Sequence, residues 1–365
     1  MKNNDLQRWF MADNIKIGVI GAGKIGTFHT RTLAKMEGME LVGVCDPDAL
    51  RAQKLAWEYN CTPYTKYEDL VPLVDAVVVA APTPLHHEVG MYCLRQGVHT
   101  MMEKPIASNM EQAKELIALA KERKVVLQVG HVERFNPAVV EAMKYIKNPK
   151  FITINRLGPY DPRMAAVGVV LDLMIHDIDL LLTMIDSKII NIEATGLSVF
   201  SSQEDIANVR FTFENGCIAD VTASRASFER ARYMHLFQED AYISVDFMNA
   251  AVKMYKKEKP VITDLKDITV FYPQVNKQMP ITSELLHFKD CILSAGTPAP
   301  SGERASMALE IAMQIEEKIN RYDLPKAATT GPAMAPKPLK DIVDVARAAK
   351  IIVDETLGSI RGKGE

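Results

Sequence analysis

Asp172 and His176 are the two residues whose types and spacing best suit acid–base chemistry. They stand four residues apart in the otherwise apolar run 169–176, so on a helix they would share one face. Oxidation of an alcohol needs a base that takes the hydroxyl proton as hydride leaves the carbon, and imidazole titrates near neutral pH. We expect His176 to be that base, with Asp172 orienting its ring. The alternative is that Asp172 and His176 form a buried, hydrogen-bonded pair that only joins a helix to a sheet.

Lys104 is the third candidate catalytic residue. It follows a predicted strand in the run Glu103-Lys104-Pro105. A lysine at the carboxyl end of a parallel strand points into the crevice where ligands of such sheets bind. Its ammonium group can polarise a reacting hydroxyl or carbonyl group. The alternative is a solvated surface lysine beside a turn proline.

A glycine-rich run indicates where a dinucleotide would bind. The predicted strand 15–20 leads directly into Gly-x-Gly-x-x-Gly, formed by Gly21, Gly23 and Gly26 with Lys24 and Ile25 between them. The first glycine permits a tight turn, the second lets the backbone approach a pyrophosphate, and the third lets the next helix pack on the strand. The helix N-terminus favours negative charge. An ordinary glycine turn is the alternative.

Asp46 distinguishes between the two nicotinamide cofactors. It follows the second predicted strand, 20 residues after Gly26, where its carboxylate can accept hydrogen bonds from the adenosine ribose hydroxyls. A carboxylate there would repel a 2′-phosphate. We therefore expect NAD rather than NADP.

A metal-dependent hydrolase is a rival that uses the same residue types. The potential ligands close in sequence are Asp172, His176, Asp177 and Asp179, with His86 and His87 elsewhere. Successive residues of one helix cannot all face one ion, and a metal site would leave the glycine run unexplained. We expect no bound metal.

Alternating strand and helix patterns would position these residues. Short β-branched runs alternate with amphipathic stretches from about residue 15 to 129, which predicts βαβ units and a parallel sheet buried on both faces. The expected strands are 15–20, 40–45, 75–80, 98–102 and 125–129. A helix over 109–123 places Ala113, Leu116, Ile117 and Ala120 at helical spacing.

A different pattern begins after residue 135. Helices are expected from near residue 137 and over 171–182, 283–294 and 304–322, and strands over 151–157, 191–197, 208–213, 217–224, 241–247 and 252–256. Turn residues between successive strands favour a largely antiparallel sheet.

The expected fold class is therefore α/β, with three segments. Residues 14–134 form a Rossmann domain with a doubly wound parallel sheet that binds NAD. Residues 135–323 form a C-terminal α/β domain with a large, mainly antiparallel sheet for substrate binding and oligomerisation. Residues 324–365 form a linker, rich in Ala, Pro, Thr and Gly, and a tail in which 339–357 is a possible helix.

Composition narrows the function classes. Charged residues make up 24% of the chain and the formal net charge is −3, so there is no basic surplus for nucleic acid or anionic lipid. No apolar run approaches the roughly 20 residues that span a bilayer, and the N-terminus lacks a signal peptide's apolar stretch. We expect a cytoplasmic protein whose 5 scattered cysteines stay reduced.

Four motifs, taken in order, resemble the Gfo/Idh/MocA oxidoreductase family. They are the glycine run, Ala81-Pro82-Thr83-Pro84-Leu85-His86, Glu103-Lys104-Pro105 and Asp172-x-x-x-His176. The resemblance implies that Lys104 is the catalytic lysine, that Glu103 acts at the nicotinamide end, and that the Lys104–Pro105 bond is cis. Pro82, Thr83 and His86 would also lie at the cofactor, although His86 could instead pack the loop that starts the next helix.

The run Gly130-His131-Val132-Glu133-Arg134-Phe135-Asn136-Pro137, with the apolar run ending at His176, resembles a bacterial branch of this family. That branch oxidises UDP-N-acetylglucosamine at the sugar 3-hydroxyl in lipid A biosynthesis. Arg134 and Arg163 could bind the diphosphate bidentately, with Lys104, Asp172 and His176 at the sugar. Salt bridging between domains is the alternative for Arg134.

The rivals are a polyol, inositol or free-sugar dehydrogenase of the same family, and a regulatory protein that binds NAD without turnover. The intact set of Lys104, Asp172 and His176 argues against the second rival. The expected partners are a sugar or nucleotide-sugar substrate and a second copy of the chain, giving a homodimer or homotetramer through the C-terminal sheet.

Overall fold

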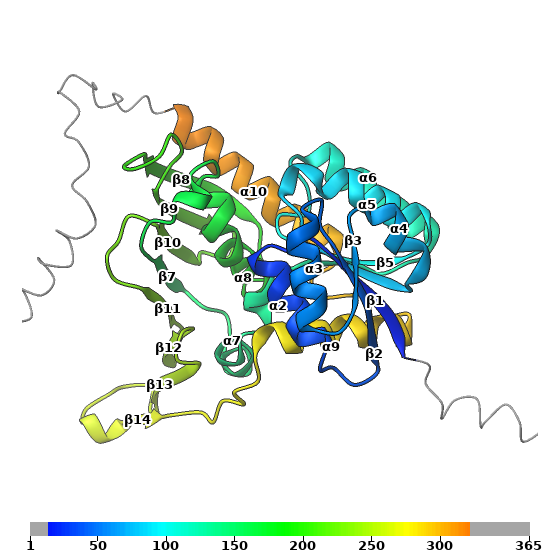
Figure 1. The fold of residues 1–365 in the computed structure, drawn as a ribbon. Helices are drawn as coiled ribbons and strands as arrows, with labels where there is room; N and C mark the ends of the chain where they lie inside the picture. The colour runs from blue at the N-terminus through cyan, green and yellow to red at the C-terminus, as the bar shows by residue number, and fades with distance from the viewer. Residues whose placement is uncertain (1–13, 322–365) are drawn as a thin grey trace, which may run out of the picture. The chain divides into compact units, whose positions relative to one another are not determined.

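A computed structural model describes residues 14–321, except for the side chains of residues 163, 320 and 321. A parallel sheet is formed in the order β3-β2-β1-β4-β5-β6 (Figure 1). Its strands are β1 (Ile15–Ile20), β2 (Met39–Cys45), β3 (Thr62–Tyr64), β4 (Ala76–Val79), β5 (His99–Glu103) and β6 (Leu127–Gly130). β1 lies between β2 and β4, so the strand order reverses there. Ligands of such sheets bind at the carboxyl ends beside this reversal.

Helices cover both faces of the parallel sheet. They are α2 (Lys24–Leu33), α3 (Ala49–Glu58), α4 (Tyr67–Leu70), α5 (His86–Arg95) and α6 (Met110–Arg123), with 3-10 turns η1 (Val71–Leu73), η2 (Thr83–Leu85) and η3 (Val132–Phe135). Alternate residues of β4 divide between two apolar clusters. Val77 packs in the cluster that contains Leu116 of α6, and Val78 packs in the cluster that contains Leu33 of α2. Both faces are therefore core, as continuous apolar strands require.

α6 shows how its sequence determines its bounds. Asn109 is the N-cap residue, and its side chain accepts a hydrogen bond from the Gln112 backbone N–H at 3.0 Å, as capping residues do. Ala113, Leu116 and Ala120 are buried, which confirms the face predicted from their spacing.

The second sheet has eight strands in the order β14-β13-β12-β11-β7-β10-β9-β8. They are β7 (Phe151–Leu157), β8 (Ile189–Leu197), β9 (Ile206–Phe213), β10 (Ile218–Ser224), β11 (Ala231–Phe237), β12 (Ala241–Asp246), β13 (Ala251–Lys257) and β14 (Ile268–Phe271). Only the β7/β10 pair among them is parallel. Buried residues alternate along β7, so one face packs on a core and the other does not.

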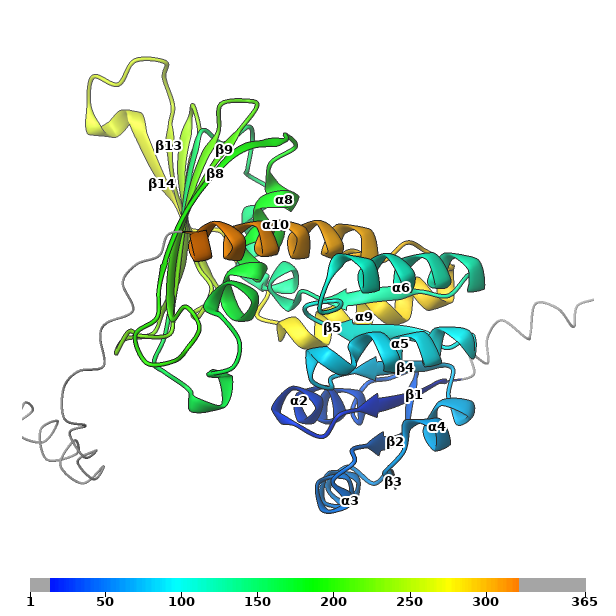
Figure 2. The same cartoon turned by 90° about the horizontal axis from the view of Figure 1, so that it is seen from above.

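Helices lie on one side of this sheet (Figure 2). The described helices after residue 136 are α7 (Pro137–Ala142), the π-helix η5 (Val170–Met174) that continues into α8 (Ile175–Met184), α9 (Pro280–Ser294) and α10 (Gly302–Arg321), with short turns η4 (Pro162–Met164) and η6 (Leu265–Asp267); α8 and α10 lie on the same side of the sheet (Figure 2). Most of α8 is buried, because it packs against α10 and shares an apolar cluster with the large sheet.

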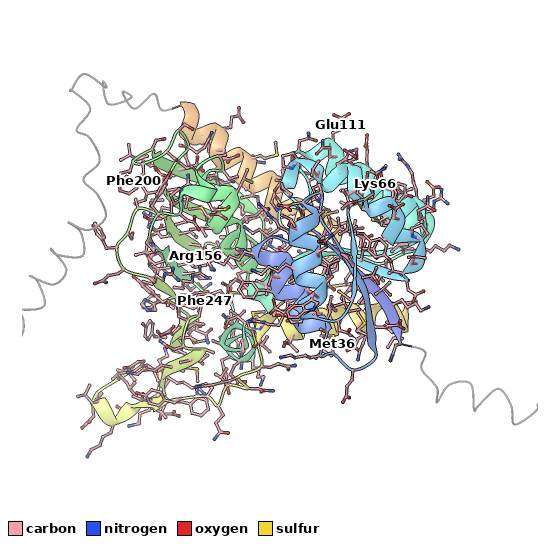
Figure 3. The ribbon with its side chains drawn as sticks, in the orientation of Figure 1. Met36, Lys66, Glu111, Arg156, Phe200 and Phe247 are labelled. Carbon is pink, nitrogen blue, oxygen red and sulfur yellow. The ribbon has the colours of Figure 1, made fainter. Side chains whose placement is uncertain are left out.

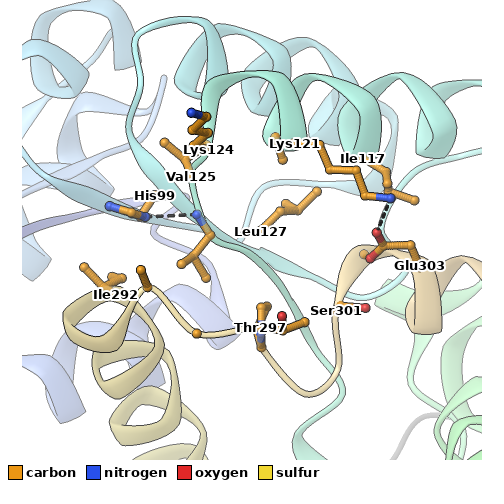
Figure 4. Close-up of a pocket in the computed structure, with 16 residues that line it drawn as sticks. His99, Ile117, Lys121, Lys124, Val125, Leu127, Ile292, Thr297, Ser301 and Glu303 are labelled. Carbon is orange, nitrogen blue, oxygen red and sulfur yellow. Dashed lines mark hydrogen bonds and ion pairs between the residues drawn. The ribbon is translucent and has the colours of Figure 1, made fainter.

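The last two described helices return to the parallel sheet. Leu285 and Phe288 of α9 belong to one of its apolar clusters, and Leu309 of α10 belongs to the other. Lys121 of α6 forms an ion pair with Glu303 of α10 at 2.7 Å, at the rim of a pocket of about 370 Å³ (Figure 4). That pocket contains none of the predicted catalytic residues.

The structure confirms the predicted fold class. All five expected strands of the parallel sheet and all six expected strands of the second sheet are present. Three strands were missed: β3 is too short to show a pattern, and β11 and β14 were not recognised as strands. The predicted helix over 171–182 is also present, but it begins as a π-helix.

The segment boundaries at residues 134 and 323 remain predictions. α9 and α10 belong to the second predicted segment by sequence, but they pack on the parallel sheet of the first. The linker and tail at 324–365, with the possible helix at 339–357, lie outside the described residues. Within 14–321, no helix is long and apolar enough to cross a membrane.

Candidate active site

The glycine turn joins β1 to α2. Gly21 has a φ of +109°, and a Cβ there would lie 2.5 Å from the Ala80 carbonyl oxygen. A Cβ at Gly26 would collide with the Gly21 carbonyl oxygen. These two glycines are therefore required by the turn and by the close packing of α2 on β1. Gly23 differs, because a Cβ there would have no protein atom within 4 Å.

Gly23 is also the N-cap residue of α2 and supplies no side-chain hydrogen bond. The first N–H groups of α2 are consequently uncapped by that residue, and Lys24 and Ile25 beside them are exposed. This open backbone at a helix N-terminus fits the pyrophosphate of NAD, whose negative charge it stabilises.

Asp46 lies beside the turn, as predicted. Its carboxylate accepts hydrogen bonds from the Ala22 N–H at 2.8 Å and the Asp48 N–H at 2.9 Å. Each carboxylate oxygen can accept a further hydrogen bond. Asp46 therefore shapes the turn and keeps acceptor capacity for ribose hydroxyls.

Pro82 and Thr83 follow β4 at the same edge of the sheet, where Pro82 is exposed and Thr83 is half-buried. His86 is different. Its ring nitrogens lie 2.8 Å from the carbonyl oxygens of Pro105 and Ala81, and only 1% of the residue is exposed. Burial lowers its pKa. His86 therefore ties two loops together, the alternative expected from the sequence, and its contact with a cofactor stays a prediction.

Lys104 lies on the loop after β5, and its bond to Pro105 is cis, as the family resemblance implied. Its ammonium group donates to the backbone carbonyl of Asp172 and lies 3.5 Å from the Asp172 carboxylate. Both side chains keep a small exposed fraction, 17% and 15%. The structure therefore brings Lys104 and Asp172 together from distant parts of the chain.

His176 stands in the first turn of α8, where the pKa of its imidazole is lowered well below the usual value. Burial is the main cause, and the nearby charges of Lys104, Arg156 and Arg232 add to it. The ring is therefore neutral at neutral pH and can accept a proton. It packs edge to face with the ring of His131, with centroids 5.9 Å apart.

The expected contact between Asp172 and His176 is absent among the described residues. Asp172 belongs to the π-helix, whose hydrogen bonds span five residues, so a spacing of four does not stack the two side chains as it would in an α-helix. Asp172 faces Lys104 instead, and Nδ1 of His176 is buried without a partner in the described structure. The prediction that Asp172 orients the imidazole was wrong.

Glu103 ends β5 beside Lys104. Its carboxylate lies 2.7 Å from Nε2 of His29. Burial alone would raise the pKa of Glu103, but the hydrogen bond and charge of His29, together with Lys104, lower it. Glu103 is thus a fixed negative charge at the carboxyl end of the sheet.

Arg134 is engaged within the protein. Its guanidinium donates to both carboxylate oxygens of Asp179 on α8, at 2.6 and 2.5 Å. Such a bidentate pair uses the geometry with which an arginine would bind a diphosphate. We therefore correct Arg134 from a substrate ligand to an ion pair between η3 and α8.

Arg156 is fully buried and joins β7 to α8. It donates to Asp177 and to Glu133, and it lies over the ring of Phe247 (Figure 3). Its partner in the β7/β11 register is Arg232, whose side chain is 44% exposed and lies 3.6 Å from Glu133. The sequence did not single out Arg232, because the strand that contains it, β11, was not among the expected strands.

Arg163 belongs to η4, and its side chain lies outside the described part of the structure. The carbonyls of Met164 and Val167 beside it accept hydrogen bonds from Arg225, which Asp205 also holds at 2.7 Å. Arg225 therefore positions this loop.

A parallel sheet with an open glycine turn and an acidic residue after its second strand defines a dinucleotide-binding enzyme fold. Comparison with known proteins agrees. The profile described as "Oxidoreductase family, NAD-binding Rossmann fold" matches residues 15–131, and the GFO/IDH/MocA C-terminal domain matches residues 153–244. The chain belongs to the Gfo/Idh/MocA family and is a NAD-binding oxidoreductase.

Several relatives cover nearly the whole described chain. UDP-N-acetylglucosamine 3-dehydrogenase from Acidithiobacillus ferrooxidans is 31% identical, over 85% of this chain and 98% of the relative. The solved structure of that enzyme has a TM-score of 0.79 over 84% of this chain and 98% of its own. The scyllo-inositol 2-dehydrogenase (NAD(+)) of Bacillus subtilis is 26% identical, over 83% of this chain and 93% of its own.

Proposed function

We propose that the chain oxidises the 3-hydroxyl of a UDP-linked N-acetylhexosamine, with UDP-N-acetylglucosamine as the first candidate, and transfers the hydride to NAD. The observation that carries this proposal is the 3.5 Å ion pair of Lys104 with Asp172 after β5, together with His176, whose pKa the charge of Lys104 helps to lower. The relative from Acidithiobacillus ferrooxidans supports this choice of substrate.

The side chains divide the chemistry between them. NAD supplies the hydride acceptor when it is bound. Lys104 donates to the reacting oxygen, and Asp172 holds the ammonium group in place. His176, neutral because of burial and neighbouring cations, takes the hydroxyl proton. Proton removal by His176 and polarisation by Lys104 therefore act on one oxygen.

Arg232 is the cation that we assign to the diphosphate. Both acidic groups, Asp177 and Glu133, form ion pairs with Arg156, whereas Arg232 forms an ion pair with Glu133 at 3.6 Å, and its side chain stays 44% exposed. It also lies close enough to lower the pKa of His176. A half-exposed guanidinium beside the proposed base suits an anionic group attached to the reacting sugar.

The product would be a 3-keto amino sugar, which is the kind of substrate that an aminotransferase takes. This chemistry underlies the proposed role in lipid A biosynthesis in the cytoplasm. A homo-oligomer formed through the open face of the eight-stranded sheet is part of the same proposal.

An inositol or free-sugar dehydrogenase is the second candidate, because relatives named as inositol dehydrogenases match most of the chain. The test is absorbance of reduced nicotinamide with NAD and a panel of UDP-N-acetylglucosamine, UDP-glucose, free sugars and inositol. We expect reduction with UDP-N-acetylglucosamine that His176→Ala abolishes. Activity on free polyols alone would overturn the nucleotide-sugar proposal, and NAD binding without reduction of any kind would favour a regulatory protein.

A further inference from the structure

The buried polar side-chain atoms without a hydrogen-bond partner, within the described residues, all belong to five residues, one of which is the proposed base His176. They are Nδ1 of His29, Oε1 of Gln128, both ring nitrogens of His131, Nδ1 of His176 and both carboxylate oxygens of Glu284. Native proteins satisfy the large majority of such atoms. Their gathering in one region is therefore a feature that requires an explanation.

These five residues come from elements that contact one another. Gln128 on β6 donates to the Glu284 carbonyl of α9 at 3.2 Å, and α9 packs on η3 directly after His131. His131 lies edge to face with His176 at 5.9 Å. His29 joins the group through Glu103 at 2.7 Å. Elements in contact with one another thus connect His176 with α9.

Within the described residues, the ring nitrogens of His131, Nδ1 of His176 and the carboxylate oxygens of Glu284 have no direct hydrogen-bond partner. Nδ1 of His131 lies 3.9 Å from the Asp179 carboxylate, beyond the range of a hydrogen bond. Buried polar atoms without a direct partner are commonly satisfied by internal water, which makes two to four hydrogen bonds inside a protein. Apolar packing cannot supply these bonds, and leaving the groups unpaired in a dry interior would be costly.

The charge states suit such water. Burial, together with Glu103 and Asp179, raises the pKa of Glu284 well above the usual value, so the carboxyl group is protonated and can both donate and accept. Burial lowers the pKa of His131, so its ring is neutral and also has one donor and one acceptor. His131 and Glu284 respond to the same two carboxylates, Glu103 and Asp179.

We propose that Glu284 and His131 hold an internal water cluster that hydrogen-bonds Nδ1 of His176 and so fixes the tautomer of the general base. In this arrangement Nδ1 carries the proton and donates it to water, which leaves Nε2 as the acceptor for the substrate proton. Glu284 and His131 are positioning residues. Their role in turnover rests on the proposed function, whereas the water site itself does not.

Direct observation of the site is the first test. A crystal structure of the full chain at high resolution, with or without substrate, should contain ordered water between His131, Glu284 and His176. A dry cluster in which these atoms bond directly to one another would overturn the proposal.

Variants of Glu284 test the effect on His176. Glu284→Gln keeps a donor and an acceptor in the same shape, whereas Glu284→Leu removes both. We expect kcat to fall about tenfold in Glu284→Leu with KM nearly unchanged, and to stay within about twofold of wild type in Glu284→Gln. Asp290→Asn, on the exposed face of the same helix, is the matched control.

The pH profile separates positioning from a loss of folding. The charges of Lys104, Arg156 and Arg232, together with His131, disfavour protonation of His176. The charges of Glu103 and Asp179 disfavour ionisation of Glu284. Removing water from Nδ1 makes the imidazolium less stable, so the acid limb of kcat/KM should move to lower pH in Glu284→Leu only. Identical profiles for the Leu and Gln variants would refute the role.

Titration of His176 by NMR of histidine-labelled protein gives the same answer without turnover. If no sugar is oxidised, the proposed function fails, but the crystal structure and the imidazole titration still decide whether the water site exists. The two failures are therefore distinguishable.

Discussion

Lys104 is held by the carbonyl and carboxylate of Asp172, so its ammonium group has a fixed place beside the base. We predict that Lys104→Met lowers kcat by at least about 100-fold, because it removes the group that polarises the reacting oxygen. NAD affinity, measured by fluorescence titration, should change little. Lys121→Met, which removes an exposed lysine paired with Glu303, is the control; an equal loss in both variants would contradict the assignment.

Arg232 separates a nucleotide sugar from a free sugar. We predict that Arg232→Gln raises KM for UDP-N-acetylglucosamine about tenfold or more, because a charge-assisted bond to the diphosphate is lost. KM for any free sugar should not change. Arg210→Gln, which removes a half-exposed arginine on β9, should behave as wild type. An unchanged KM in Arg232→Gln would place the diphosphate elsewhere.

Single residues could be predicted from the sequence where a local motif specifies them. The glycine turn, Asp46 and Lys104 each follow a recognisable strand, and the structure places them at one edge. His86 and Arg134 could not be assigned in this way, because their partners are distant: the Pro105 carbonyl for His86 and Asp179 for Arg134. His131 and Glu284 have no motif that marks them as a pair.

At the scale of elements, the glycine turn contains two kinds of glycine. A Cβ at Gly26 would collide with the Gly21 carbonyl, whereas a Cβ at Gly23 meets no protein atom. We predict that Gly26→Ala lowers both thermal stability and NAD affinity, because α2 can no longer pack on β1. Gly23→Ala should keep the wild-type melting temperature and lose NAD affinity, because only the pyrophosphate needs its space.

Thermal unfolding and NAD titration of the two variants check this prediction. Each variant serves as the control for the other, since both add one methyl group to the same turn. A drop in melting temperature for Gly23→Ala would show that this glycine is required by the protein and not by the cofactor.

Elements with strong periodicity could be predicted, and those shaped by their surroundings could not. β1 and β7 have the bounds expected from their apolar patterns. β11 was missed because Arg232 replaces an apolar residue on its buried face, next to Arg156. The π-helix before α8 was missed because no sequence pattern distinguishes it from an α-helix, although it decides that Asp172 faces Lys104.

At the scale of the whole described chain, the return of α9 and α10 to the first sheet explains why the site is buried. Leu285 and Phe288 of α9 complete a cluster with β1 residues such as Ile17. Their spacing predicts a helix, but it does not indicate which sheet they cover. The same packing carries Glu284 into the protein interior beneath Glu103 and Asp179, so a carboxyl group is buried by the tertiary fold.

The burial of Glu284 should make stability depend on pH in a defined direction. Its folded pKa is raised well above the usual 4.5, so above that pH the unfolded chain loses a proton that the folded protein keeps. The contribution of Glu284 to the free energy of unfolding is therefore largest below about pH 4.5, and it is lost as the pH rises toward the folded pKa. Glutamine does not titrate, so the stability of Glu284→Gln should not fall with rising pH for this reason.

We predict that the melting temperature of Glu284→Gln rises relative to wild type as pH increases from about 5 to about 8. The buried neutral rings of His86, His131 and His176 act in the opposite direction, because the unfolded chain takes up protons on them as pH falls. That effect is common to both proteins and cancels in their difference. Differential scanning calorimetry across this range, with Asp290→Asn as control, checks the prediction; a constant difference would mean that Glu284 is ionised in the folded protein.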